Sequence, residues 1–361
     1  VNVGTSPVGD RGITWVGEQN NCTGVLSLSN TAEFRTARIT MAVQSGTTGT
    51  LNLFGGTLKT ANITGGSGTS TVVFNGTQII ATGNSATFID SLGTATIDAG
   101  NLKVDSAGYV LSASQFLTGT GGVVKSGNGT LTLTSANDFT GPNQINQGKL
   151  VLSTEHTGGG DVTTADGATF GVLQNLDISL AVPNVTMGGT GASNLDIDLG
   201  NGFGNPSSAA LNVTNALTLN GTVTVNVADA NPEVGSFPVI TYSAKSGSGS
   251  FVLGSLPNGV SATLTDDDAG TVTLNINSIS FPKWTGAFDA NWDTTTQNWI
   301  DQLSSNPSNF ANGAPVLLDD TATGLTAIDL IGTLTPGDVK LENSSLAYTL
   351  NGSGKISGST G

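Results

Sequence analysis

Carboxylate pairs are the residues of this sequence best suited to chemistry, since two carboxyl groups held a fixed distance apart can cleave a glycosidic bond. The candidates are Asp196 with Asp198, the run Asp266–Asp268, and Asp319 with Asp320. Asp196 and Asp198 form the best pair, because alternation along a strand would place both on one face. We favour the simpler interpretation of a solvated outer face, and we expect Asp266–Gly270 to form a hairpin turn.

The sequence lacks the residues that nucleophilic catalysis and a transition-metal site would need. His156 is the single histidine and Cys22 the single cysteine, so the chain cannot supply the several ligands of a transition-metal site or close an internal disulfide. A Ser-His-Asp triad would have to use His156, and no Gly-x-Ser-x-Gly turn lies between a strand and a helix. We therefore interpret His156 as a solvated turn residue, assign no catalytic residue, and expect no enzymatic activity.

Calcium is the least implausible metal, because hard cations bind carboxylates and loop carbonyls. Neither the EF-hand spacing nor the nonapeptide calcium repeat occurs in the sequence. We therefore predict no metal or cofactor site, and bound calcium stays open as an alternative.

Aromatic residues gather in one segment, where Trp284, Trp292 and Trp299 are close in sequence to Phe281 and Phe288. Exposed rings on a β-scaffold could stack against sugars, as a glycan-binding adhesin would require. Aromatic residues make up only 6% of the chain, however, and large rings in such a protein tend to fill a core. We favour a core or a plug between modules.

The charge balance limits the partners. A net charge of −15 argues against nucleic acid, because binding a phosphate backbone needs a basic surface. Most of the chain cannot clamp an anionic substrate either, since its only arginines are Arg11, Arg35 and Arg38. No apolar run is long enough for a transmembrane helix. The chain starts at Val1 and not at Met, which we interpret as an export signal already removed or a truncated chain.

Strands must position these residues, because 51 glycines among frequent Thr, Ser and Asn disfavour helix interiors. A small-residue turn followed by alternating Thr and aliphatic residues recurs along the chain. In Gly129–Leu133 this alternation directs Leu131 and Leu133 inward. Glycine pairs such as Gly121-Gly122 suit tight bends, so we predict an all-β fold, a parallel β-helix (β-solenoid) with irregular β-rich modules, over a sandwich or barrel. Corner asparagines could form side-chain ladders between its rungs, although asparagine is common at any turn; the candidates are Asn52, Asn75, Asn128 and Asn220.

Residues 119–152, GTGGVVKSGNGTLTLTSANDFTGPNQINQGKLVL, resemble the autotransporter-associated β-strand repeat of bacterial passenger domains. The shared landmarks are Lys125-Ser126-Gly127, the strand Gly129–Leu133, Asn137–Gly141 and the closing Gly148–Leu152. The sequence departs from the family at Gly141-Pro142-Asn143, where glycine and threonine are usual, so this turn is expected to differ. The resemblance implies a right-handed parallel β-helix displayed outside the cell, and it implies no reaction.

We divide the chain into β-helix rungs with the repeat (1–160), a continuing β-rich module (161–280) and the Trp-rich start of a further module (281–361). Neither end shows a capping helix: residues 1–4 resemble a strand, and residues 348–361 stop in mid-pattern. Uncapped rungs offer unpaired strand edges. We expect more of the same protein to cover them, either a longer polypeptide or subunits stacked head to tail into a fibre.

Three functions fit these observations. The one we favour is an extracellular structural β-solenoid, either a surface-displayed passenger or a filament subunit. An adhesin that binds glycans or neighbouring cells comes second, and a polysaccharide-active β-helix enzyme third.

Overall fold

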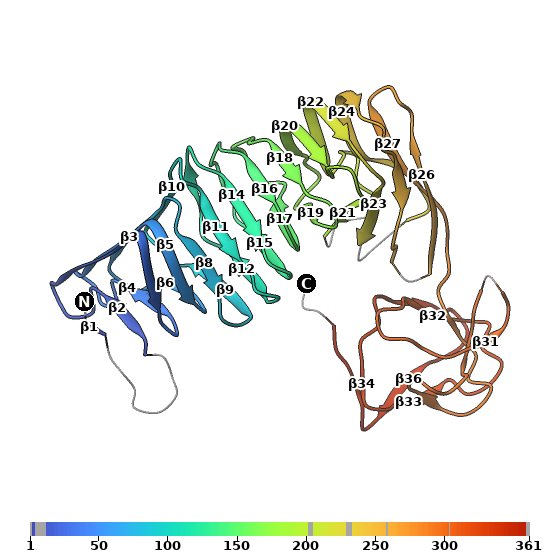
Figure 1. Ribbon diagram of the computed structural model, residues 1–361. Coiled ribbons are helices and arrows are strands. Elements are labelled where there is room, and N and C mark those ends of the chain that lie inside the picture. Colours follow the sequence, from blue (N-terminus) through green and yellow to red (C-terminus); the bar gives the residue numbers. More distant parts are fainter. Residues whose placement is uncertain are drawn as a thin grey trace.

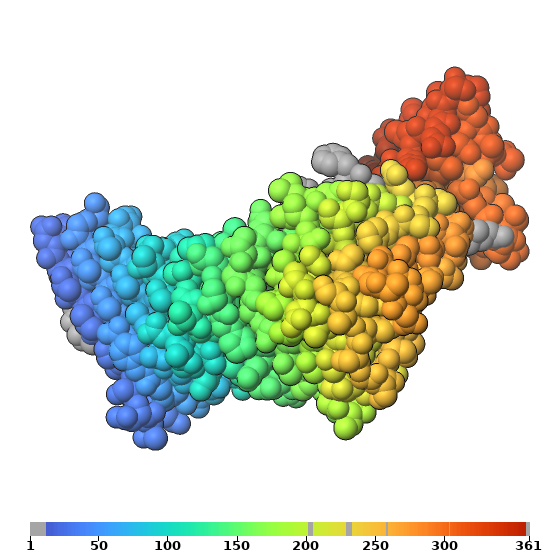
Figure 2. All heavy atoms as spheres, turned by 90° about the horizontal axis from the view of Figure 1, so that it is seen from above, coloured from blue at the N-terminus to red at the C-terminus, as the bar shows by residue number. Residues whose placement is uncertain are grey.

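The computed structural model describes residues 2–3, 12–200, 205–228, 233–257, 259–302 and 304–358, and none of these residues forms a helix. The described residues do not include Arg11. They also do not include residues 1, 4 and 359–361, which belong to the two chain ends where the sequence predicts unpaired strand edges. Strands stack in sequence order along an elongated body, as the colours of Figures 1 and 2 show. The expected all-β solenoid is confirmed.

Two long sheets form the main body (Figure 1). The 12-stranded sheet contains, in spatial order, β1 (Asn2–Val3), β2 (Thr14–Val16), β4 (Ile39–Met41), β6 (Ile63–Gly65), β9 (Ser85–Asp90), β12 (Val110–Ala113), β15 (Thr130–Leu133), β17 (Lys149–Ser153), β19 (Thr169–Leu173), β21 (Ser193–Asp198), β23 (Val223–Ala228) and β25 (Phe251–Leu253). The 15-stranded sheet contains β13 (Thr118–Gly119), β10 (Thr94–Ile97), β7 (Thr69–Phe74), β5 (Thr48–Thr60), β8 (Gln78–Ala81), β11 (Leu102–Asp105), β14 (Val123–Ser126), β16 (Asn143–Ile145), β18 (Val162–Thr164), β20 (Leu180–Met187), β22 (Leu211–Leu219), β24 (Gly235–Ser246), β27 (Thr271–Ile279) and β26 (Val260–Asp266), with β3 (Thr23–Arg35) beside β5.

The N-terminal rungs have three faces because β5 turns a corner. Its first half pairs in parallel with β7, and its second half pairs in parallel with β8. After β13 the third face continues as irregular backbone that still bonds to the rung before it. Thr140 donates its N–H to the Gly119 carbonyl at 2.9 Å, and Thr157 donates to Asn137 at 2.8 Å. The stack therefore keeps its inter-rung hydrogen bonds where regular strands end.

Parallel register aligns the core. Leu131 pairs with Leu150, Leu150 with Phe170, and Phe170 with Leu195, and all four side chains are buried. Thr130, which alternates with these inward positions, is half-buried on the outer side. Because paired residues of parallel strands point to the same side, each rung extends one apolar column that runs along the body. The alternation predicted for Gly129–Leu133 is confirmed.

Antiparallel strands lie at both ends of the main stack. β1 pairs antiparallel with β2, and at the other end β27 pairs antiparallel with β24 and with β26. In Figure 1 the hairpin β26–β27 follows the last parallel strands of the body. Strand pairing also continues across residue 160, since β16 pairs with β18 and β17 with β19.

Strands between residues 283 and 356 form a second, smaller stack (Figure 1). Its buried residues make up a core of their own. A five-stranded sheet contains β31 (Pro307–Ser308), β30 (Trp299–Ile300), β28 (Lys283–Trp284), β32 (Val316–Asp319) and β35 (Val339–Glu342). Two further parallel sheets contain β29 (Asn291–Trp292), β33 (Ala327–Leu330) and β36 (Thr349–Gly352), and β34 (Thr333–Leu334) with β37 (Lys355–Ile356). Parallel pairing on three faces makes this unit a short solenoid as well.

Glycine is required where corners of successive rungs touch. A Cβ on Gly141 would lie 2.3 Å from the Gly121 carbonyl carbon, and one on Gly160 would lie 1.9 Å from the Gly141 oxygen. Real Cβ atoms do not approach so closely, so any other residue would separate the rungs. Gly121 belongs to the glycine pairs for which the sequence predicted tight bends.

The four corner asparagines bond to neighbouring rungs, but to partners other than asparagine, so they do not form the side-chain ladder that the sequence left open. Asn75 accepts the Gly100 N–H at 2.8 Å, and Asn128 accepts from the Gln147 amide at 2.8 Å. Asn52 and Asn220 also donate to neighbouring rungs. A ladder of stacked side chains is present at another corner, where Asn215 bonds to Asn184 and Asn184 to Asp161.

Candidate functional site

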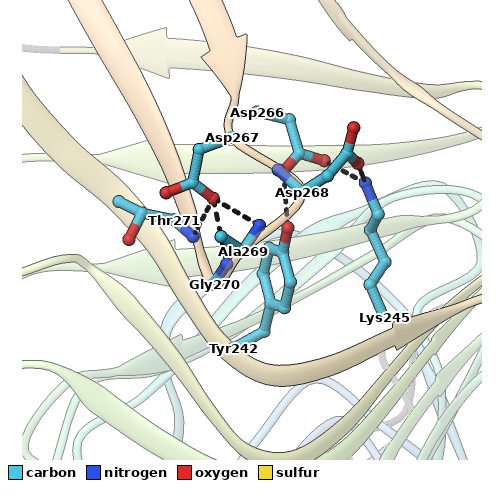
Figure 3. Close-up of polar contacts among 8 residues, drawn as sticks. All are labelled: Tyr242, Lys245, Asp266, Asp267, Asp268, Ala269, Gly270 and Thr271. Atoms are coloured by element: carbon cyan, nitrogen blue, oxygen red, sulfur yellow. Dashed lines mark hydrogen bonds and ion pairs between the residues drawn. The ribbon is translucent and has the colours of Figure 1, made fainter.

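A cluster of polar side chains lies at the turn of the hairpin β26–β27, which ends the main stack (Figure 3). Lys245 of β24 contacts the carboxylates of Asp266, at 2.6 Å, and of Asp268. The Tyr242 hydroxyl donates to Asp266 at 2.6 Å. Asp267 accepts three backbone N–H bonds from the turn itself, at 2.8, 2.9 and 2.8 Å. The hairpin turn predicted for Asp266–Gly270 is confirmed.

Titration of this cluster follows from its contacts. Burial raises the pKa of Tyr242, and the hydrogen bond to Asp266 adds to the effect, so that the pKa reaches about 12. Burial alone would lower the pKa of Lys245, but its bonds to Asp266 and Asp268 outweigh burial and raise it. The pKa of Asp266 falls below its ordinary value because the bonds to Lys245 and Tyr242 outweigh burial. All three groups are thus held in their neutral-pH charge states, and the cluster fastens the hairpin to β24.

Asp196, the best sequence candidate for an acid or base, is already engaged. Lys149 of β17 contacts its carboxylate at 2.7 Å, and Asn226 of β23 donates to it at 2.8 Å. Asp198 lies two residues further along β21 and accepts the Gly200 N–H at 2.9 Å. These contacts join Asp196 to β23, the strand next to β21, and to β17, which lies beyond the intervening strand β19. They are contacts along the outer face of the sheet, as the favoured interpretation implies.

Asp319 and Asp320 are adjacent in sequence but serve different rungs. Asp319 contacts Lys283 of β28 at 3.1 Å. Asp320 accepts the backbone N–H groups of Ser344, Ser345 and Leu346, each at 2.8 Å, from the following rung. Its bond from the Ser344 hydroxyl, together with these N–H groups, lowers the pKa of Asp320 far below the ordinary value. Its carboxylate therefore fixes a corner of the stack.

The interpretation of His156 as a solvated residue is wrong. Its side chain is 3% exposed and packs on Phe139, with ring centroids 4.5 Å apart. Nδ1 lies 2.8 Å from the Asn137 carbonyl oxygen, to which it donates in the neutral tautomer that this contact selects. Burial lowers the pKa of His156. The turn-like sequence around it gave no sign that Phe139 would cover the ring.

Lys125 is the buried charged residue that the sequence reasoning missed. It is fully buried in the inward column of β14, and its ammonium donates to the carbonyls of Ser126, Gly127 and Gln147 at 2.8, 2.7 and 3.1 Å. Burial lowers the pKa of Lys125 to about 8 against the opposing effect of Asp105. Alternation along Val123–Ser126 was the available signal, since it places Lys125 on the same face as Val123.

The tryptophan cluster is a core, as the favoured interpretation predicted. Trp284, Trp292 and Trp299 are at most 1% exposed, and Trp299 meets the other two edge to face at 5.1 and 5.0 Å. Phe310 closes the cluster, whereas Phe288 is exposed. None of the three indoles can therefore stack against a sugar in this structure.

No group of three or more His, Cys, Asp or Glu side chains suited to a metal occurs in the part of the chain that the structure describes. Within the same described ranges, no helix has the length and apolarity needed to cross a bilayer.

The fold is a β-solenoid: its rungs stack in parallel, its corner residues are hydrogen-bonded between rungs, and each of its two stacks has a continuous core.

The family described as passenger-associated-transport-repeat matches residues 123–152, the segment from β14 to β17. The chain therefore carries an autotransporter passenger repeat, and the resemblance of residues 119–152 is confirmed. The chain is also similar to "Adhesin BmaC autotransporter" of Brucella suis biovar 1 (strain 1330), with 25% identity over 301 residues. This alignment covers 81% of the chain and 7% of that relative. No solved structure matches the chain.

Proposed function

We propose that the chain is a section of an extracellular, surface-displayed passenger of the autotransporter type, in which it acts as a rigid scaffold without catalytic activity. One observation carries the proposal: the passenger repeat at residues 123–152 forms parts of two successive rungs of the stack, since its β14 pairs with β16 and its β15 with β17. Its Lys125 and Leu131 lie in the same continuous interior as the residues of neighbouring rungs. The repeat is thus part of the architecture that the whole body shares.

Adhesion is the second candidate, and the name of the relative favours it. An adhesive solenoid would bind through its outer faces, on which large apolar side chains are scattered. Phe54, Phe116 and Phe288 are exposed and could contact a glycan or a cell surface. Support for a scaffold without catalysis comes from Asp196, Asp266, Asp319 and Asp320, whose carboxylates are held by lysines or by backbone N–H groups.

Display is tested by placing the chain between an export signal and an autotransporter translocator in a Gram-negative host. We expect intact cells to bind an antibody against the chain and to lose this signal after external protease. A chain that is expressed and folded but remains inside the cell would contradict the proposal.

Adhesion and catalysis are tested with the purified chain on glycan arrays, on cell monolayers and with soluble polysaccharides. Binding that falls with Phe288→Ala or Phe116→Ala, but not with Lys103→Ala, would select the adhesin. Trp292→Ala is unsuitable because Trp292 is buried. Release of sugar ends that stops with Asp196→Ala would overturn the proposal of a scaffold without catalysis.

Head-to-tail self-association, bound calcium and the division at residues 160 and 280 remain predictions. Sedimentation at increasing concentration, with calcium or with chelator, tests the first two. Limited proteolysis tests the third.

A further inference from the structure

The last rung of the C-terminal stack exposes the side chains that should form its interior. Leu341 of β35 is 62% exposed, Leu350 of β36 is 46% and Ile356 of β37 is 38%. One such residue comes from each of the three faces. Exposed apolar residues are ordinary when scattered, but these three occupy equivalent positions of one rung.

Register shows that all three positions point inward. Leu341 pairs with Leu318, Leu350 with Ile328, and Ile356 with Leu334. The three partners, Leu318, Ile328 and Leu334, are at most 1% exposed and belong to the core of this stack. Since paired residues of parallel strands point to the same side, the last rung repeats the interior of the rung before it. It differs in that no further rung covers it within residues 304–358, the part of the C-terminal chain that the structure describes.

The opposite end of this stack is closed. Trp284 and Trp292 lie in the first rung, and the hairpin β30–β31 places Trp299 against them. Phe310 packs against Trp292 at 5.5 Å. Among the described residues, aromatic rings therefore cover the first rung of this stack, whereas the inward residues of the last rung are exposed.

We propose that Leu341, Leu350 and Ile356 form the docking surface for the next parallel β-rung of a longer polypeptide, which brings one aliphatic side chain to each face. The pairing between the last two rungs would continue unchanged into this contact. Paired inward residues of those rungs are about 22 residues apart, the length expected of one solenoid repeat. The matched relative is also far longer, since the chain covers 7% of it.

A second copy of the chain fits this surface less well. Three strand edges would have to be met at once, and at the N-terminal rung the outer side of β2 is already paired with β1. That rung offers β3, which pairs with β5 and is bulged between Asn30 and Glu33. Bulges disfavour further pairing at an edge.

The inference rests on the proposed function in one respect, that the chain is a section of a longer passenger. The docking surface can be tested on the purified chain, without export to a cell surface. A copy of residues 339–358 is appended directly after Gly361, which keeps the rung spacing. The control carries Asp at the three appended positions that correspond to Leu341, Leu350 and Ile356.

We expect amide exchange in β35, β36 and β37 to slow at least tenfold in the extended chain, and the melting temperature followed by tryptophan fluorescence to rise. The control copy should produce neither effect. Unchanged exchange in the extended chain, or equal protection by the control, would overturn the proposal.

Sedimentation of the unextended chain separates the two possible occupants. Monomers across the concentration range support docking within one polypeptide. Dimers that Leu341→Asp and Leu350→Asp abolish, with the circular dichroism spectrum unchanged, would assign the surface to a second copy and contradict the proposal. Protection by the appended rung in a chain that fails to reach the cell surface would leave the docking surface intact and reject the display.

Discussion

Lys149 reaches Asp196 across an intervening rung, because Gly171 between them has no side chain. Thr169–Leu173 is the strand that separates β17 from β21, and a Cβ on Gly171 would lie 3.0 Å from the Lys149 Cε. The ion pair at 2.7 Å thus joins rungs that are not neighbours.

A double-mutant cycle with Lys149→Ala and Asp196→Ala should give a coupling free energy of about 0.5–1 kcal/mol, because both side chains are partly solvated. Urea unfolding measures it, and high salt should reduce it. In a Gly171→Val background the coupling should disappear, since valine occupies the path of the lysine stem. The same coupling in that background would show that the pair does not depend on Gly171.

Lys125 should make stability depend on alkaline pH. Its pKa is about 8 in the folded chain and 10.5 ordinarily, so between these values the unfolded chain binds a proton that the folded chain lacks. Stability should therefore rise from pH 8 to 10.5, by up to about 3 kcal/mol relative to Lys125→Met, which does not titrate. Urea unfolding of both proteins across this range measures the difference. A difference that stays constant would mean that three carbonyls keep the ammonium charged.

Gly141→Ala should destabilise the main stack by about 2 kcal/mol or more, because its Cβ would meet the backbone of Gly121. Gly83→Ala is the matched control, since a Cβ there has no atom within 4 Å. Chemical denaturation compares the two variants with the parent chain. Equal effects of the two substitutions would argue against close corner packing.

Lys245→Ala should loosen the hairpin β26–β27, with a cost of about 1–2 kcal/mol for the lost charged hydrogen bonds. Amide exchange in β26 and β27 should accelerate, while Lys103→Ala leaves it unchanged. Acid should act in the same direction: because the pKa of Asp266 lies below its ordinary 3.8, the stability that it contributes is present above that pH and is lost as the pH falls further. Unaltered exchange in Lys245→Ala would show that strand pairing alone holds the hairpin.

Trp292→Ala should unfold the C-terminal stack and spare the main body, because the two cores are separate clusters. Truncating a buried tryptophan costs about 3–5 kcal/mol, enough to melt a small unit. Protease should then remove residues after 280 and leave the larger fragment. Phe288→Ala, at an exposed ring, serves as control. Loss of the whole chain to protease would show that the stacks unfold together.

The main solenoid could be predicted because its strands are long enough to show a period of two. Leu131 and Leu133 alternate with threonines, and glycines mark the corners. The sequence indicated a further module from residue 281 but not that this module is a parallel stack, because strands such as β28 and β29 contain two residues each, too few for a period to appear. In this stack, parallel strands pair between segments that are about 20 residues or more apart in sequence. The alternation of apolar and polar residues within one strand does not reveal such distant pairing.

Side-chain environments were harder to predict than strands. The burial of the tryptophans could be inferred from composition, whereas the burial of His156 and Lys125 depends on which rung covers each side chain. Asn137 and Phe139 meet His156 from another rung, 19 residues away for Asn137. The Lys125 ammonium finds three carbonyl acceptors only because the corner at Gly127 and the corner at Gln147 of the next rung both lie beside it. Such contacts belong to the stacking register and are not visible in the local sequence.

Hydrogen bonds between rungs run along the length of the body, and this sets its mechanical character. Each rung of about 20 residues adds roughly 4.8 Å of length, whereas the same residues fully extended would span roughly 70 Å. A pull along the axis is shared by the bonds of every face. The stack should therefore behave as a stiff strut that lengthens only by releasing whole rungs, each of which frees several nanometres of slack.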